Sequence, residues 1–148
     1  MNLRHQLANA ASNRETVLAL GVFDGVHLGH QHLLLRLVQM AGPSRMPAVL
    51  TFSNHPATVL RPGTHAGYLT TPEAKIRLIK EQGVELVVSL EFTLELAQVS
   101  AQDFASMLVE LLRTKGLVLG PDAVLGHNRE GTVDFLRSRG DDLGFWVE

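Results

Sequence analysis

The chain of 148 residues contains no cysteine, which excludes disulfide bridges, thiolate metal sites and thiol nucleophiles. It also has no apolar run near the roughly 18 residues that spanning a bilayer requires, and residues 1–14 are too polar for a secretory leader. The formal net charge is only −2, so the chain lacks the broad basic field of a nucleic-acid-binding surface. We therefore expect a soluble cytoplasmic protein that binds neither membranes nor nucleic acid.

The composition that remains is that of an ordinary globular protein. Hydrophobic residues make up 45% of the chain and charged residues 19%, which argues against disorder and fibrous repeats. A chain of this length buries roughly 70% of its unfolded surface when it folds. We expect one domain that spans residues 1–148.

Apolar runs of strand length alternate with segments of helical spacing along the chain. Strands are predicted at 16–22, 47–52, 86–90 and 116–120, with a fifth starting at 145–147. Helices are predicted from Gly29 to Gly42, from a capping Thr70 to Gly83, from Ser100 to about Leu112, and briefly through Leu136 and Arg137. This alternation predicts an α/β fold: a Rossmann-like, doubly wound parallel sheet of about five strands with helices on both faces.

Ligands bind beyond the carboxyl ends of the strands in open parallel sheets, near the point where the strand order reverses. The loops at those ends are predicted at 23–28, 53–68 and 121–131, and they are rich in glycine, histidine and proline. A loop as long as the second inside a compact domain is more often functional than not. The site is therefore expected where these three loops meet.

The first of these loops has the residue types that capture phosphate. Gly21 and Gly25 permit close backbone approach, Asp24 supplies a carboxylate, and His27 and His30 flank the start of a helix whose free amides attract anions. A zinc site is not expected, because cysteine is absent and no third ligand follows at helical spacing. Purely structural histidines remain an alternative, since a strand, a glycine loop and a helix occur in many phosphate-binding folds.

The pattern Gly-x-Phe-Asp-Gly-x-His-x-Gly-His at residues 21–30 resembles the signature of the cytidylyltransferase-like nucleotidyltransferase superfamily. Two further segments, Thr51-Phe-Ser-Asn-His-Pro56 and Gly126-His-Asn-Arg-Glu-Gly131, are similar to the adenylyltransferase (FAD synthetase) domain of the bacterial bifunctional riboflavin kinase/FMN adenylyltransferases. The resemblance runs from about Val17 to Arg137.

This resemblance implies an FMN adenylyltransferase that uses ATP with Mg²⁺, converts FMN to FAD and releases pyrophosphate. It implies that His27 and His30 are catalytic and stabilise charge during an in-line displacement, for which no strong general base is needed. The phosphate-binding residues it implies are Gly21, Val22, Phe23, Asp24, Gly25 and Gly29. The flavin or nucleotide pocket it implies consists of Asn54, His55, Pro56, Asp122, Asn128 and Arg129. No residue is assigned as a direct metal ligand.

The chain also departs from the family pattern. Val22 replaces the usual asparagine or lysine, and Ala123-Val-Leu-Gly126 replaces an aromatic-rich segment that would stack better on a flavin ring. The second phosphate motif of the superfamily, Ser-Ser/Thr-x-x-Arg, and the riboflavin kinase domain would lie beyond Glu148. We therefore expect a domain truncated at its C-terminus, with weak nucleotide binding and slow turnover. A related transferase for pantetheine phosphate, nicotinamide mononucleotide or a polyol phosphate, and a nucleotide- or flavin-binding module without catalysis, remain alternatives.

Overall fold

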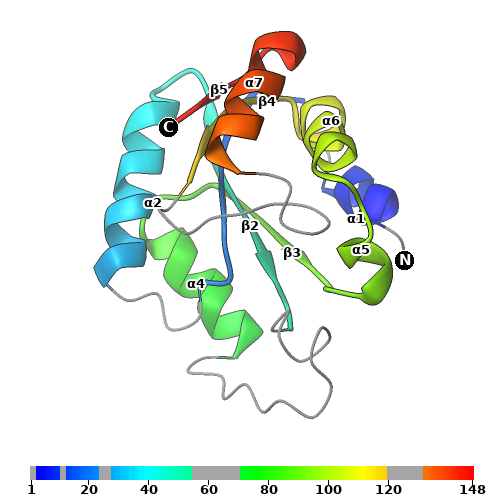
Figure 1. The fold of residues 1–148 in the computed structure, drawn as a ribbon. Helices are drawn as coiled ribbons and strands as arrows, with labels where there is room; N and C mark the ends of the chain where they lie inside the picture. Colours follow the sequence, from blue (N-terminus) through cyan, green and yellow to red (C-terminus); the bar gives the residue numbers. More distant parts are fainter. Residues whose placement is uncertain (1–2, 11–12, 24–27, 55–70, 120–131) are drawn as a thin grey trace.

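The structure is a computed structural model that describes residues 3–10, 13–23, 28–54, 71–119 and 132–148. A five-stranded sheet lies between two layers of helices (Figure 1). The strands are β1 (Thr16–Leu20), β2 (Met46–Phe52), β3 (Leu86–Leu90), β4 (Thr114–Val118) and β5 (Trp146–Val147). The helices are α1 (Leu3–Asn9), α2 (Leu28–Ala41), α4 (Pro72–Glu81), α5 (Leu94–Ala97), α6 (Ala101–Leu112) and α7 (Val133–Leu143).

The strand order is β3-β2-β1-β4-β5, and every neighbouring pair is parallel. The first two strands pair in register, from Thr16 opposite Met46 to Leu20 opposite Leu50. The chain moves outward from β1 to β3 and then returns to the other side of β1 to form β4 and β5. The predicted fold class is therefore confirmed, and the strand order reverses at β1 and β4.

Each face of the sheet has its own apolar core. Val17 and Ala19 of β1 pack with Leu34 and Leu37 of α2 and with Ile79 of α4. Their neighbour Leu18 points to the opposite face, where the second core lies under α1, α5, α6 and α7. Successive strand residues alternate between the faces, so a strand covered on both sides is apolar throughout.

Side-chain caps explain where the helices begin. The hydroxyls of Thr93, Ser100 and Thr132 each accept a hydrogen bond from a backbone amide three residues later, at the starts of α5, α6 and α7. The prediction that Thr70 caps α4 was wrong by one residue, because Thr71 is the cap and its hydroxyl accepts from the amide of Ala74 at 3.1 Å. With Thr71 as the cap, Pro72 is the first helical residue, where its missing N–H needs no partner.

Other element boundaries also differ from the prediction. The fourth strand begins at Thr114, because Arg113 takes a left-handed conformation (φ 51°) that ends α6 abruptly, and the strand ends at Val118. Helix α7 has 11 residues, so it is longer than the short helix expected. Helices α1 and α5 were not predicted. In α1 the only strong signal is the buried pair Leu3 and Leu7, one helical turn apart.

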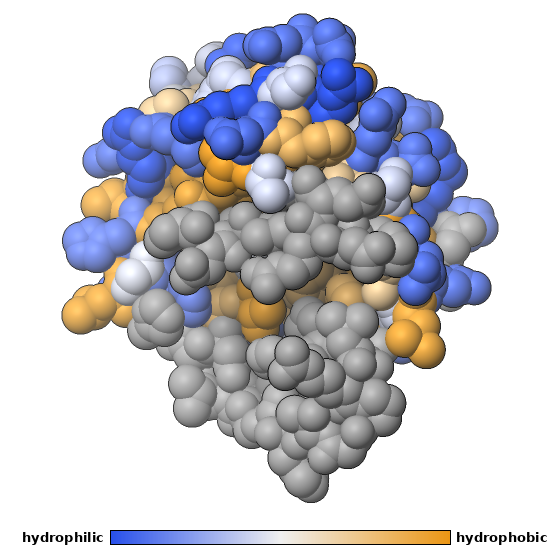
Figure 2. Space-filling view, viewed as in Figure 1, coloured by the Kyte–Doolittle hydropathy of each residue, from blue (hydrophilic) through white to orange (hydrophobic). Residues whose placement is uncertain are grey.

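The outer surface is mixed in character. Hydrophilic side chains gather at the top of the space-filling view, and hydrophobic ones show as small separate patches (Figure 2). The large hydrophobic side chains that are exposed in the described ranges are Leu28, Leu35 and Leu94. Within the part of the chain that the structure describes, no helix is both long enough and apolar enough to cross a membrane.

Candidate functional site

The carboxyl ends of β1, β2 and β3 lie at one edge of the sheet, together with the first turns of α2 and α4, at the bottom of Figure 1. Parallel strands place all their carboxyl ends on the same side, so residues that follow different strands meet there. Gly21, Val22 and Phe23 follow β1, Ser53 and Asn54 follow β2, and Phe92 follows β3. The sequence predicts the phosphate and flavin pockets at this edge, in the loops that follow β1, β2 and β4.

The segment after β1 makes a tight turn. The Gly21 amide donates to the Leu50 carbonyl of β2 at 3.1 Å, and a Cβ on Gly21 would lie 2.9 Å from the Phe23 ring. Phe23 has a left-handed backbone (φ 55°) although it is not glycine, which costs roughly 1–2 kcal/mol. The residue is only 2% exposed, so burial of its side chain in the core offsets that cost. The turn therefore needs glycine at 21 and a large apolar side chain at 23.

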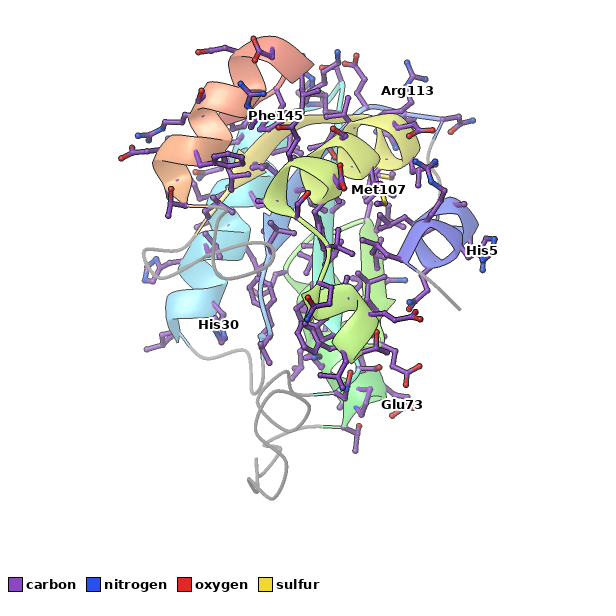
Figure 3. The ribbon with its side chains drawn as sticks, turned by 45° about the vertical axis from the view of Figure 1, so that its right-hand side comes forward. His5, His30, Glu73, Met107, Arg113 and Phe145 are labelled. Carbon is purple, nitrogen blue, oxygen red and sulfur yellow. The ribbon has the colours of Figure 1, made fainter. Side chains whose placement is uncertain are left out.

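Phe23 contacts His30, one of the two predicted catalytic histidines. The two rings meet edge to face, with centroids 5.1 Å apart and planes inclined at 63°. His30 lies in the first turn of α2, on the side of the helix that faces the sheet (Figure 3). Gly29 precedes it and is exposed. The structure therefore brings four of the predicted phosphate-site residues together at the start of α2: Gly21, Phe23, Gly29 and His30.

Val22, the fifth of these residues that the structure describes, is held through its backbone carbonyl. The carbonyl oxygen accepts hydrogen bonds from Thr51 Oγ1 at 2.9 Å and from Lys75 Nζ at 2.9 Å. Both donors come from distant parts of the chain, β2 and α4. The contact involves no atom of the Val22 side chain, so the replacement of asparagine or lysine at this position leaves it intact.

Lys75 is the residue of this edge that the sequence analysis missed. Its ammonium also donates to the Phe52 carbonyl, at 2.6 Å, and the residue is only 6% exposed. The available signal was its position: Lys75 precedes the fully buried Ile79 by one helical turn, on the apolar face of α4. A lysine at such a position is rarely buried unless its charge is bonded.

Asn54 joins the ends of β2 and β3. Its Nδ2 donates to the Phe92 carbonyl at 2.9 Å, and its Oδ1 accepts from the Phe92 amide at 2.7 Å. The rings of Phe52 and Phe92 pack edge to face beside this pair, at 5.4 Å and 90°. Asn54 therefore has a structural role at the predicted flavin pocket, and its contact with flavin stays a prediction.

Eight of the predicted site residues lie outside the described residues: Asp24, Gly25, His27, His55, Pro56, Asp122, Asn128 and Arg129. Their roles stay predictions. Within the ranges that the structure describes, no group of three or more histidine, aspartate or glutamate side chains could hold a metal ion.

Comparison with known proteins shows the family of the chain. A family model described as FAD synthetase matches residues 9–148. A bifunctional riboflavin kinase/FMN adenylyltransferase of Escherichia coli K12 is 35% identical over 143 residues, which cover 95% of this chain and 45% of that protein. The protein of the same description from Listeria monocytogenes is 36% identical over 127 residues, covering 84% of this chain and 40% of that protein.

Two more similarities extend this result. A protein of Listeria monocytogenes described as FAD synthetase is 30% identical over 132 residues, covering 88% of this chain and 54% of that protein. The crystal structure of a macrolide-efflux protein from Streptococcus pneumoniae superposes with a TM-score of 0.83 at 28% identity, covering 96% of this chain and 48% of that one. The chain thus spans about half the length of these relatives. Because the family model matches nearly all of its residues, the chain belongs to the FAD synthetase family.

Proposed function

We propose that this chain is an FMN adenylyltransferase domain, which transfers AMP from ATP to FMN and releases pyrophosphate. Membership of the FAD synthetase family supports this assignment. The observation that carries it is the strained turn at Phe23, which packs His30 at the carboxyl edge of the sheet, where such folds bind nucleotides. Backbone strain of this kind is concentrated at functional sites.

The reaction is a direct displacement at phosphorus. A phosphate oxygen of FMN attacks the α-phosphorus of ATP, and the bond from that phosphorus to the oxygen bridging to the β-phosphate breaks. FAD and pyrophosphate are the products, so atoms and charge balance without a covalent enzyme intermediate. FMN phosphate is already an anionic nucleophile, so the protein contributes positioning and electrostatic stabilisation.

In this proposal His30 donates a hydrogen bond to an ATP phosphate oxygen as negative charge develops there. The edge contact with Phe23 holds the imidazole in the first turn of α2, where the helix amides also favour anions. His27 and the backbone of residues 21–25 and 29 complete the phosphate site by the family resemblance. Mg²⁺ enters as the counter-ion of ATP, and no step is assigned to a protein-bound metal.

The flavin pocket is proposed at the ends of β2 and β3. Asn54 connects these ends by its two hydrogen bonds to Phe92, and His55 and Pro56 follow it directly. Asp122, Asn128 and Arg129 would reach the same edge from the loop after β4. FMN itself is the product of riboflavin phosphorylation, so a riboflavin kinase is the proposed partner activity.

The experiment that tests this function compares His30→Ala with His32→Ala, a second histidine of α2 that is exposed to solvent. Formation of FAD from FMN and ATP with Mg²⁺ is followed by chromatography, and pyrophosphate release is followed separately. Loss of one preorganised donor should lower kcat by about a hundredfold in His30→Ala, whereas His32→Ala should retain its rate.

Equal rates in the two variants would contradict the role of His30. Binding of ATP and FMN without any product, even when the domain is complete, would instead indicate a binding module. Titration with pantetheine phosphate and nicotinamide mononucleotide tests whether FMN is the preferred acceptor.

A further inference from the structure

Lys75 is a cation buried beside the phosphate site, and nothing in the family assignment uses it. It lies within the first turns of α4, and the residue is 6% exposed. Both features disfavour a charge there, because burial removes hydration and the N-terminal end of a helix is itself positive. An apolar side chain of similar length would avoid both costs. The hydrogen bonds that the ammonium makes offset these costs.

The two bonded carbonyls belong to the segments that follow β1 and β2. Lys75 Nζ donates to the Val22 oxygen at 2.9 Å and to the Phe52 oxygen at 2.6 Å. Residues 22 and 52 are 53 and 23 positions away from Lys75 in the sequence. One side chain thus joins the ends of two neighbouring strands at the candidate site.

The bond to Val22 orients the next peptide. A carbonyl that accepts from both Lys75 Nζ and Thr51 Oγ1 cannot rotate without losing two hydrogen bonds. The peptide is planar and trans, so the amide N–H of Phe23 points to the opposite side from Lys75. This peptide is one end of the φ rotation of Phe23, whose left-handed backbone carries the ring that packs against His30.

We propose that Lys75 is a positioning residue for adenylyl transfer, which fixes the Val22–Phe23 peptide and, through the Phe23 ring, the imidazole of His30. It acts without contact with the substrate. Its buried charge also raises the positive potential at the edge that receives the ATP phosphates. This inference rests on the proposed function of the site.

The test replaces Lys75 with methionine, which keeps the length of the side chain and removes both the charge and the donors. Lys80→Met is the matched control, because Lys80 lies on the same helix and is exposed. At a temperature where both variants are folded, Lys75→Met should lower kcat by roughly tenfold to a hundredfold, since small misplacements of catalytic groups have this effect. The KM for FMN should stay within about twofold, and Lys80→Met should match the unchanged chain.

A second measurement follows the His30 ring by NMR in the absence of ligand. The ring current of Phe23 shifts the His30 imidazole protons, so these signals should move in Lys75→Met and stay in place in Lys80→Met. A role in stability alone would lower the melting temperature without moving the signals of the folded variant. A folded Lys75→Met chain with unchanged kcat and unchanged His30 signals would overturn the proposal.

A measurement on the unchanged chain covers the case in which Lys75→Met does not fold. ATP with Mg²⁺ should shift the side-chain nitrogen signal of Lys75, which is tied to the phosphate turn, and leave that of Lys80 in place. Saturation with ATP without a Lys75 shift would overturn the inference. A complete domain that neither binds ATP nor forms FAD contradicts the proposed function instead, and the ligand-free His30 signals then decide alone whether Lys75 positions the imidazole.

Discussion

Replacement of Asn54 with alanine should separate its structural role from a role in flavin binding. The substitution removes both hydrogen bonds to the Phe92 backbone, of 2.9 and 2.7 Å, and leaves that amide and carbonyl without these partners. Each bond contributes about 1 kcal/mol net, so we expect a loss of about 2 kcal/mol in the free energy of unfolding. For a chain of this size the loss corresponds to roughly 4–8 °C in Tm.

Urea denaturation followed by circular dichroism measures this loss. Ser53→Ala is the control, because its hydroxyl makes only a 3.4 Å contact with the Leu90 carbonyl and the residue is exposed. The control should change stability by less than about 0.5 kcal/mol. An Asn54→Ala chain as stable as Ser53→Ala would refute the claim that this amide holds the ends of β2 and β3 together.

The same variant also tests the predicted flavin contact. If Asn54 only connects the strand ends, the affinity of folded Asn54→Ala for ATP and for FMN should change by similar small factors. A loss confined to FMN would show a direct contact with flavin. Both affinities are measured by calorimetry at a temperature where the variant is folded.

Three further substitutions test other parts of the structure. Gly116→Ala should lower the free energy of unfolding by roughly 1–3 kcal/mol in chemical denaturation, because the added methyl group would overlap the indole of Trp146 on the neighbouring strand. An unchanged denaturation midpoint would contradict the packing of β4 on β5. Thr51→Val should lower the free energy of unfolding by about 1 kcal/mol in the same assay, because the Val22 carbonyl loses one of its two hydrogen-bond donors. Unchanged stability would contradict that hydrogen bond. The hydrogen bonds and charge of Arg4 hold the pKa of Glu110 below its ordinary value of 4.5. The Arg4–Glu110 pair therefore stabilises the fold above pH 4.5, and this stabilisation is lost as the pH falls through the lowered pKa of Glu110. Glu110→Gln should therefore narrow the stability difference between pH 7 and pH 3, and an unchanged pH profile would contradict the pairing.

Several elements could be predicted from the sequence because their signals are local. The strand at 86–90 is a short run of apolar residues, and the helix after Ser100 begins with a hydroxyl that accepts from an amide three residues later. Both signals lie within a few residues of the sequence, where a linear pattern records them, although the strand itself forms by pairing with β2. The starts of α4 and β4 were predicted wrongly, because they depend on which of several neighbouring residues caps the helix or takes the left-handed conformation.

Only the tertiary structure decided which side chains hold the site together. Lys75 contacts carbonyls 53 and 23 positions away, and Asn54 bonds to a residue 38 positions away. These contacts exist because the parallel register brings the ends of β1, β2 and β3 to one edge and α4 packs beside them. Residue types and spacing therefore predicted the phosphate motif, whose role stays a prediction, whereas the buried lysine behind it follows from the packing of α4 against the sheet.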